Sequence, residues 1–156
     1  MTIIISHRGN LDGPSSTENN PLSIDRALSL GFDVEIDIWC DKHTIFLGHD
    51  NPQYKIDLSY LTDRRNKLWI HCKNLESLFF FSSKNENLEY FWHQNDDYTL
   101  TKNNFIWTFP NRPLCQNSIA VMPLDEETTL SKKIHGICTD YPNRVKEFLL
   151  KKEKND

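Results

Sequence analysis

Short apolar runs rich in β-branched and aromatic residues recur along the chain, and most of them end at a polar or ionisable residue. Seven runs of this kind stand out: Thr2–Ser6, Val34–Ile38, Leu68–Ile70, Leu88–Trp92, Phe105–Phe109, Ser118–Met122 and Gly136–Thr139. Their length and composition predict buried strands. A further run, Thr44–Leu47, follows the polar turn Cys40–His43 and predicts a short hairpin.

Segments with a helical period separate several of these strands. They are Pro21–Leu30, Asn74–Ser82, Thr128–Lys133 and Asn143–Lys152. The first is clearly delimited, because Asn20 can cap it, Pro21 suits its first position and Gly31 follows its last turn.

Strands that alternate with helices indicate a parallel sheet with crossover helices. Functional groups at the strand ends are typical of an α/β barrel or a doubly wound sheet. A complete eight-fold barrel takes roughly 250 residues, whereas this chain has 156. We therefore predict an α/β fold: a reduced TIM-like (β/α) barrel of about seven parallel strands, forming one domain over residues 1–156. Some helices are expected to be missing, with loops at Asn51–Lys67 and Asn111–Asn117.

Two carboxylates interrupt the second strand. Glu35 and Asp37 are one residue apart within Val34–Ile38, so the two-residue period of a strand points both to the same side. On an ordinary amphipathic strand this side would be the solvated face. In a parallel barrel both sides are covered, and two like charges then repel unless a cation lies between them. Carboxylate oxygens suit Mg²⁺ or Ca²⁺, so the pair predicts a divalent metal site.

Two histidines end strand-like runs before and after this pair. His7 follows the first strand, and His49, with Asp50 beside it, follows the run Ile45–Gly48. A lone histidine is usually structural or exposed, but two in these positions can serve as general base and general acid, because neutral and protonated imidazole coexist near pH 7. Arg8 adds a planar guanidinium that suits phosphate oxygens.

The strand beginning at Leu68 repeats the same spacing with His71 and Lys73. This can be a solvated face. In a covered site, Lys73 would neutralise a phosphate and His71 could bind the metal. His93 and Asp96 also stand at a strand end, without a partner that the sequence identifies.

Composition narrows the range of partners and compartments. The formal net charge is −4, with basic residues scattered along the chain, which argues against nucleic acid. The N-terminal apolar run is too short for a signal peptide, and no stretch reaches the roughly 18 apolar residues of a membrane span. We therefore expect a soluble, cytoplasmic protein. The four cysteines contain no C-x-x-C pair and are expected to be buried free thiols.

Five pieces of sequence, taken together and in order, resemble a known family. They are His7-Arg8-Gly9, Glu18-Asn19, a helix with Ala27 and Gly31, Asp33-Val34-Glu35-Ile36-Asp37 and Gly48-His49-Asp50. The terminal strand, Gly136-Ile137-Cys138-Thr139-Asp140-Tyr141-Pro142, also matches and closes the set. This pattern is similar to the glycerophosphodiester phosphodiesterase family, part of the phospholipase-C-like phosphodiesterase superfamily of α/β barrels. A single H-R-G would carry no weight, whereas the ordered set brackets the whole chain.

The resemblance implies metal-dependent cleavage of a small-molecule phosphodiester, in which a neighbouring substrate hydroxyl attacks phosphorus and water later opens the cyclic phosphate. His7 and His49 would share the acid and base roles. The metal, Mg²⁺ or Ca²⁺, would be held by Glu35 and Asp37. Charge developing on the phosphate would be stabilised by Arg8 and Lys73, with Glu18 and Asp50 in supporting positions.

The chain departs from the family pattern at His71, where the family commonly has a glutamate that supplies a third metal ligand. The insertion that usually follows the H-D motif is also reduced to the short link Asn51–Lys67. These departures leave a second interpretation: a catalytically degenerate barrel that binds a phosphate ligand or acts as a regulatory module. A purely structural domain is a third, but it gives the Glu35/Asp37 pair no electrostatic role. Missing helices would expose apolar surface, which favours a homodimer.

Overall fold

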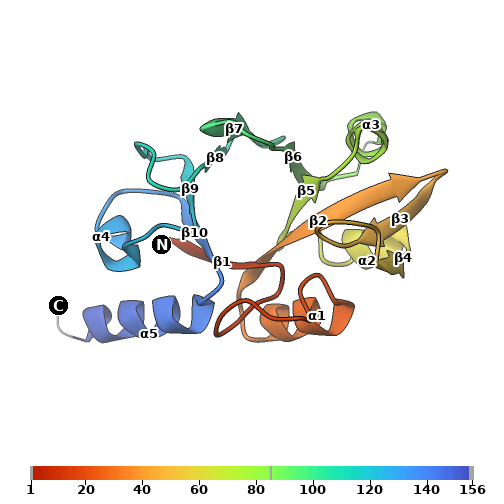
Figure 1. Ribbon diagram of the computed structural model, residues 1–156. Helices are drawn as coiled ribbons and strands as arrows, with labels where there is room; N and C mark the ends of the chain where they lie inside the picture. Colours follow the sequence, from red (N-terminus) through yellow and green to blue (C-terminus); the bar gives the residue numbers. More distant parts are fainter. Residues whose placement is uncertain (1, 85, 155–156) are drawn as a thin grey trace.

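The computed structural model describes residues 2–84 and 86–154 and is built around one strongly curled sheet with helices on its outer side (Figure 1). In this part of the chain the sheet has ten strands. The strands are β1 (Ile3–His7), β2 (Asp33–Asp41), β3 (Thr44–Leu47), β4 (Tyr54–Ile56), β5 (Leu68–Cys72), β6 (Glu89–Trp92), β7 (Tyr98–Leu100), β8 (Ile106–Thr108), β9 (Ser118–Val121) and β10 (Gly136–Thr139). The helices are α1 (Pro21–Ser29), α2 (Leu58–Thr62), α3 (Leu75–Ser83), α4 (Glu126–Leu130) and α5 (Pro142–Glu153).

Seven of these strands run parallel to one another, in the order β6-β5-β2-β1-β10-β9-β8. The long strand β2 is central, because its first half pairs with β1 and its middle pairs with β5 along the other edge. Its last residues turn back through the hairpin to β3, which pairs with β4. The hairpin expected at Thr44–Leu47 is therefore present.

The expectation of a parallel barrel needs correction, because the sheet is mixed and does not close. Strands β3, β4 and β7 are antiparallel to their neighbours. On the open side, β7 pairs with β8, and β6 has no ladder partner beyond β5 among the strands that the structure describes. A backbone hydrogen bond from Lys102 to Tyr90, 2.9 Å long, spans this side in place of a strand pair. The result is a half-barrel built on seven adjacent parallel strands.

Side-chain caps mark the starts of α1, α3 and α4. The Asn20 side chain accepts a hydrogen bond from Leu22 N at the start of α1, and Asn74 forms a capping box with Ser77 at the start of α3. The segment Asn51–Lys67 was expected to be a loop, but it contains β4 and the short helix α2. The other predicted loop, Asn111–Asn117, has no helix.

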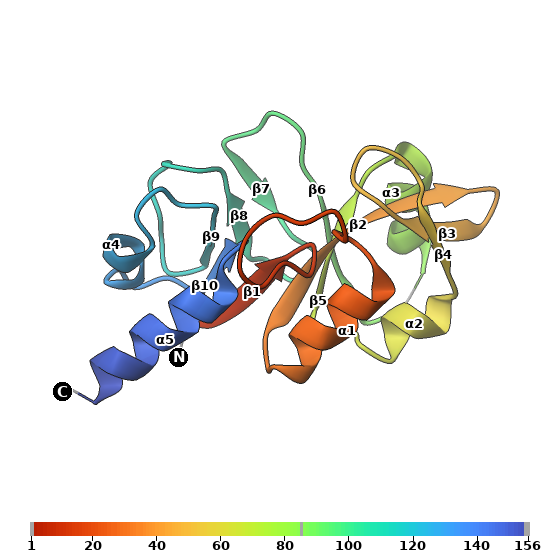
Figure 2. The ribbon, with the colours of Figure 1, turned by 60° about the horizontal axis from the view of Figure 1, so that its bottom comes forward.

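Apolar side chains fill both sides of the curled sheet. Inside the curl a cluster packs together: Ile5, Trp69, Phe91, Trp107, Ile119 and Cys138. On the outside, α1, α2 and α3 cover the opposite side chains of β2 and β5, while α5 covers β10 through Val145 (Figure 2). Residues of β2 and β5 therefore have buried environments on both faces, as the sequence predicts for parallel strands. No helix within residues 2–84 and 86–154 has the length and apolar character needed to cross a bilayer.

The four cysteines differ in exposure, which gives a direct check of the packing. Cys40, Cys72 and Cys138 are buried free thiols, whereas Cys115 is exposed. Burial raises the pKa of Cys40 to about 11 and that of Cys72 to about 12. For Cys115, a hydrogen bond from Ser118 lowers the pKa.

The reactivity of the cysteines toward alkylation depends on the thiolate, which is the reactive form. At pH 8 we expect iodoacetamide to label one site of the native protein rapidly and all four in urea, as counted by intact mass. Rapid labelling at two or more native sites would contradict this packing.

Candidate active site

The ionisable side chains gather on the inner side of the curl, at the carboxyl ends of β1 and β5 and in the first half of β2. Glu35 and Asp37 are 2% and 0% exposed, so β2 does not present them as a solvated face. Pairing of β2 with β5 places Asp37 directly beside His71. The alternation inferred from the sequence therefore brings three potential ligands together, each from an inward-facing strand position.

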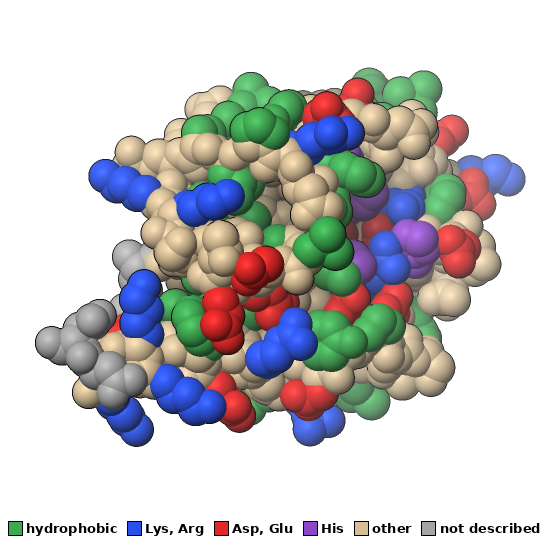
Figure 3. Space-filling view, turned by 60° about the vertical axis from the view of Figure 1, so that its left-hand side comes forward, with side chains coloured by type: hydrophobic (Ala, Val, Ile, Leu, Met, Phe, Trp, Pro, Cys, Tyr) green, Lys and Arg blue, Asp and Glu red, His purple; other side chains and the backbone are tan. Residues whose placement is uncertain are grey.

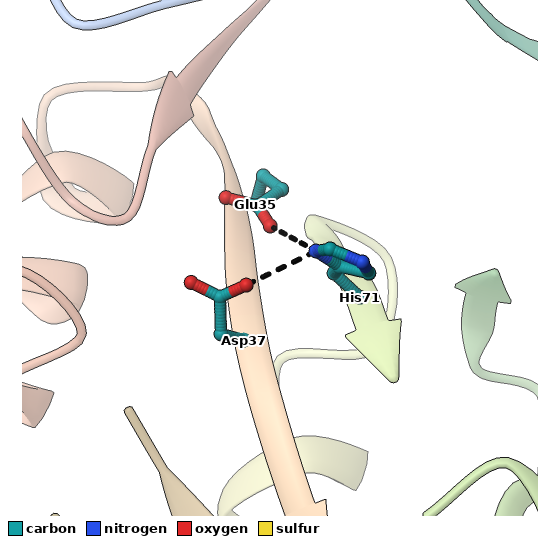
Figure 4. Close-up of side chains that lie close together, drawn as sticks. All are labelled: Glu35, Asp37 and His71. Atoms are coloured by element: carbon teal, nitrogen blue, oxygen red, sulfur yellow. Dashed lines mark ion pairs between the residues drawn. The ribbon is translucent and has the colours of Figure 1, made fainter. Parts of the chain in front are cut away.

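These three side chains point toward one another (Figure 4). His71 Nδ1 lies 3.0 Å from Asp37 Oδ1 and 3.8 Å from Glu35 Oε1. One potential ligand atom from each residue lies within 4.8 Å of the others. Two carboxylates and an imidazole in this arrangement suit a divalent cation.

The Asp37 carboxylate is surrounded by cations. Its Oδ2 lies 3.0 Å from Arg8 Nε, and its Oδ1 lies 3.4 Å from Lys73 Nζ. Asn19 fixes the residue further, because its side-chain amide donates to Oδ2 and its carbonyl oxygen accepts from Asp37 N, both at 2.9 Å. Burial alone would raise the pKa of Asp37, but the adjacent His71 ring and the charges of Arg8 and Lys73 lower it well below its usual range. Asp37 is therefore held as the anion.

Glu35 has the opposite environment. Its Oε2 atom is buried and has no hydrogen-bond partner among the described residues. Burial and the neighbouring charge of Asp37 together raise the pKa of Glu35. A buried carboxylate oxygen without a partner is costly unless a cation or a proton satisfies it. A metal ion bound to the Glu35 oxygens would supply the partner that the described protein groups do not provide for Oε2.

His7 faces the same space from β1. Its Nδ1 lies 2.7 Å from Asp140 Oδ1, and its Nε2 lies 3.9 Å from Glu35 Oε2. Burial disfavours the imidazolium, yet the hydrogen bond to Asp140 and the charge of Glu35 raise the pKa of His7. Asp140 also accepts a hydrogen bond from Asn10 at 2.8 Å. The carboxylate thus orients the His7 ring so that Nε2 points into the site.

Asp140 was part of the terminal-strand motif but was not among the predicted site residues. Its position follows from the parallel pairing of β10 with β1, in which Thr139 lies opposite Ser6. The next residue along each strand, Asp140 and His7, then lies on the inner side of the sheet. The sequence shows only that an acid follows the last strand and that a histidine ends the first strand; that the two meet depends on the pairing of β10 with β1.

The loop after β1 adds two residues to the site. Arg8, with a left-handed backbone at φ 55°, turns its guanidinium toward Asp37 and also contacts Glu18 Oε2 at 3.0 Å. Glu18 Oε1 accepts a hydrogen bond from Asn10 at 2.8 Å. Glu18 therefore contacts both Arg8 and Asn10 of this loop, and its supporting role stays a prediction.

His49 and Asp50 form a separate pair at the rim. Their side chains meet at 2.8 Å, with exposures of 39% and 84%. Within the described ranges, neither side chain has a hydrogen bond or ion pair with the cluster. The backbone of this turn is nevertheless tied to the site, because Gly48 N–H donates to Asp37 O at 3.2 Å and Gly48 O accepts from Trp39 Nε1 at 2.6 Å.

Gly48 is required by the geometry of this turn. Its φ is +150°, and a Cβ there would lie 2.1 Å from Asn51 O. We expect Gly48→Ala to displace the neighbouring His49 and to lower the free energy of unfolding by about 1–3 kcal/mol. Urea denaturation measures the change in this free energy. Gly31→Ala is the matched control, because Gly31 also has a positive φ, +93°, but nothing lies within 4 Å of its Cβ position. Equal losses in the two variants would contradict the close contact at Gly48.

The strand-end residues His93 and Asp96 lie beside the cluster rather than in it. The backbone oxygen of His93 accepts a hydrogen bond from His71 Nε2 at 2.8 Å, and Asp96 is exposed. Burial and the neighbouring His71 lower the pKa of His93.

In the space-filling view, histidine, basic and acidic side chains gather in a recess of the surface (Figure 3).

Comparison with known proteins gives a match in fold but none in sequence. No protein-family model and no curated protein sequence matches the chain. The structure is similar to the crystal structure of a putative glycerophosphodiester phosphodiesterase from Galdieria sulphuraria, with a TM-score of 0.54, 11% sequence identity, and coverage of 96% of this chain and 98% of that chain. At this identity the likeness establishes the fold alone. It supports the predicted family resemblance at that level: the chain has a phosphodiesterase-like α/β fold with a Glu/Asp/His cluster that could hold a metal.

Proposed function

We propose that this protein is a phosphodiester hydrolase that uses a divalent metal, a glycerophosphodiester phosphodiesterase-like enzyme. One observation carries the proposal: the buried Glu35 carboxylate has an Oε2 without a hydrogen-bond partner 3.9 Å from His7 Nε2, and its Oε1 lies 3.8 Å from His71 Nδ1. A structural domain has no need of a buried carboxylate in this state. Candidate acid–base, metal-binding and phosphate-binding groups thus surround one space.

Substrate binding is assigned to the basic side chains. Arg8 offers a planar fork and Lys73 a compact charge, both next to Asp37, and both suit the oxygens of a phosphodiester. Glu35, Asp37 and His71 would hold the metal, which when bound polarises a phosphoryl oxygen. Glu18 keeps Arg8 in place by their ion pair.

Proton transfer is assigned first to His7. In the neutral ring, Nδ1–H would donate to the Asp140 carboxylate, so that Nε2 would carry the lone pair that takes the proton from an attacking hydroxyl group. The Asp140 carboxylate then stabilises the imidazolium that forms. His49, at the rim, would return a proton to the leaving alcohol, with Asp50 holding its Nδ1.

A binding or regulatory module is the second candidate. Two observations favour it: His49 is held apart from the cluster by its own pair with Asp50, and Asp37 is already compensated by Arg8 and Lys73. Such a module would bind a phosphate ligand at Arg8 and Lys73 without turning it over.

A chelation experiment separates the two candidates. Purified protein is incubated with bis(p-nitrophenyl) phosphate and a panel of glycerophosphodiesters, before and after EDTA treatment and with added divalent ions. We expect turnover that EDTA abolishes and added metal restores. Turnover that resists chelation would contradict the metal requirement. Phosphate binding by calorimetry without any turnover would support the binding module instead.

A further inference from the structure

The His71 ring is held in one orientation by two contacts outside the carboxylate pair. Nε2 lies 2.8 Å from the backbone oxygen of His93, and the ring stacks on Phe91 with centroids 5.2 Å apart and planes 6° apart. A carbonyl oxygen can only accept a hydrogen bond, so Nε2 carries the proton. The parallel pairing of His71 with Phe91 on β5 and β6 builds both contacts into the sheet.

This orientation leaves Nδ1 as the lone-pair nitrogen of the neutral ring, and Nδ1 faces Asp37 and Glu35. Its 3.0 Å contact with Asp37 Oδ1 would join two acceptors, an arrangement that a cation between them relieves. A metal-bound histidine usually donates its other ring nitrogen to a carbonyl or carboxylate, which fixes the tautomer. The His93 carbonyl supplies that contact here.

The oxygen donors available in the cluster are few. Asp37 Oδ2 is already engaged by Arg8 Nε and the Asn19 amide. This leaves Asp37 Oδ1, which lies 3.4 Å from Lys73 Nζ and has no hydrogen-bond partner among the described residues, together with the two oxygens of Glu35. Calcium takes six to eight oxygen ligands, commonly including bidentate carboxylates, and Mg²⁺ requires near-ideal octahedral oxygen geometry. Imidazole nitrogen is a better ligand for first-row transition ions than for either of these.

We infer that the site selects a first-row transition dication, Mn²⁺, Co²⁺ or Zn²⁺, over Mg²⁺ and Ca²⁺, with His71 Nδ1 as a direct ligand. This inference rests on the metal-binding part of the proposed function and replaces the Mg²⁺ or Ca²⁺ expected from carboxylates alone. His71 then determines which metal binds. A nitrogen ligand in place of a third carboxylate changes the preferred ion and does not abolish the site.

The test measures binding on the full chain without substrate. Isothermal titration with the chloride salts of Mn²⁺, Co²⁺, Zn²⁺, Mg²⁺ and Ca²⁺ gives the order of affinity, and pulsed EPR of the Mn²⁺ complex detects a directly bound ¹⁴N. We expect the transition ions to bind about tenfold or more tightly than Mg²⁺ or Ca²⁺, with a clear ¹⁴N coupling. His71→Glu should remove the coupling and reduce the preference by about tenfold or more.

His93→Ala is the matched control, because it removes the neighbouring imidazole while keeping the backbone oxygen that orients His71. We expect it to keep both the ¹⁴N coupling and the order of affinity. The EPR result on the unaltered chain stands even if His71→Glu does not fold.

Equal affinities for all five ions, or a Mn²⁺ complex without ¹⁴N coupling, would overturn the inference. Turnover of phosphodiesters is measured separately with each ion. Chelator-sensitive turnover without the preference overturns this inference alone, while the preference without turnover upholds it and overturns the proposed function. Failure to bind any of the ions overturns both.

Discussion

Replacing His7 with alanine is expected to lower kcat for phosphodiester turnover by about 10²–10⁴-fold, the range of a general acid–base contribution. The reason is geometric: His7 Nε2 reaches the space beside Glu35, and Asp140 holds the ring at 2.7 Å. Initial rates at saturating substrate measure the effect, and circular dichroism confirms that the variant is folded. Added imidazole should restore part of the rate.

His43→Asn is the control for this variant. His43 lies in the exposed turn between β2 and β3 and has a positive φ of 71°, which asparagine tolerates. We expect its kcat to equal that of the unaltered protein. Unchanged turnover in His7→Ala would remove His7 from the mechanism, and with it the acid–base assignment.

Replacing Trp107 with alanine is expected to lower the free energy of unfolding by about 3–5 kcal/mol, the usual cost of truncating a buried aromatic residue. Trp107 is 4% exposed and packs inside the curl, with its ring centroid 4.5 Å from that of Phe91 and 6.1 Å from that of Trp69. Removing it would leave a cavity beside Phe91 and Trp69, inside the curl. Urea denaturation followed by circular dichroism measures the loss.

Phe79 provides the comparison for Trp107. It lies on α3 and is 69% exposed, so Phe79→Ala should change the free energy of unfolding by no more than about 0.5 kcal/mol. A loss below about 1 kcal/mol for Trp107→Ala would contradict a packed interior.

The sequence predicts the Glu/Asp/His cluster because its signal is local. Alternation along one strand places Glu35 and Asp37 on the same side, and the same rule places His71 and Lys73 together on the next strand. It takes only adjacent parallel pairing, which the structure has between β2 and β5, to bring the two sets into contact. The decision between a solvated and a covered face needed the fold, and burial of both acids settles it.

Other parts of the site depend on contacts that are distant in sequence. The contact between His7 and Asp140 joins residues separated by 133 positions and exists only because the terminal strand β10 lies beside β1. The place of His49 depends on a hairpin turn rather than on a parallel strand, so strand alternation does not determine where its imidazole points. Sequence patterns therefore indicate His49 as a candidate without fixing its distance from the cluster.

Local sequence patterns also could not predict that the barrel stays open. Closure of a curled sheet depends on whether its two last strands meet, and this chain places the short antiparallel strand β7 at that edge. Tyr98 and Leu100 of β7 are exposed, so β7 lacks the apolar continuity that marks the buried strands. Similarly, β4 and α2 have only three and five residues, which is too short for a hydrophobic period to identify them.

The position of the metal can be determined in a crystal structure of the protein soaked in Mn²⁺, with data collected at the Mn absorption edge. We expect a single strong anomalous peak within coordination distance of Glu35, Asp37 and His71 Nδ1. An absent peak, or one coordinated elsewhere while these three side chains keep their positions, would contradict the assignment of this cluster as the metal centre.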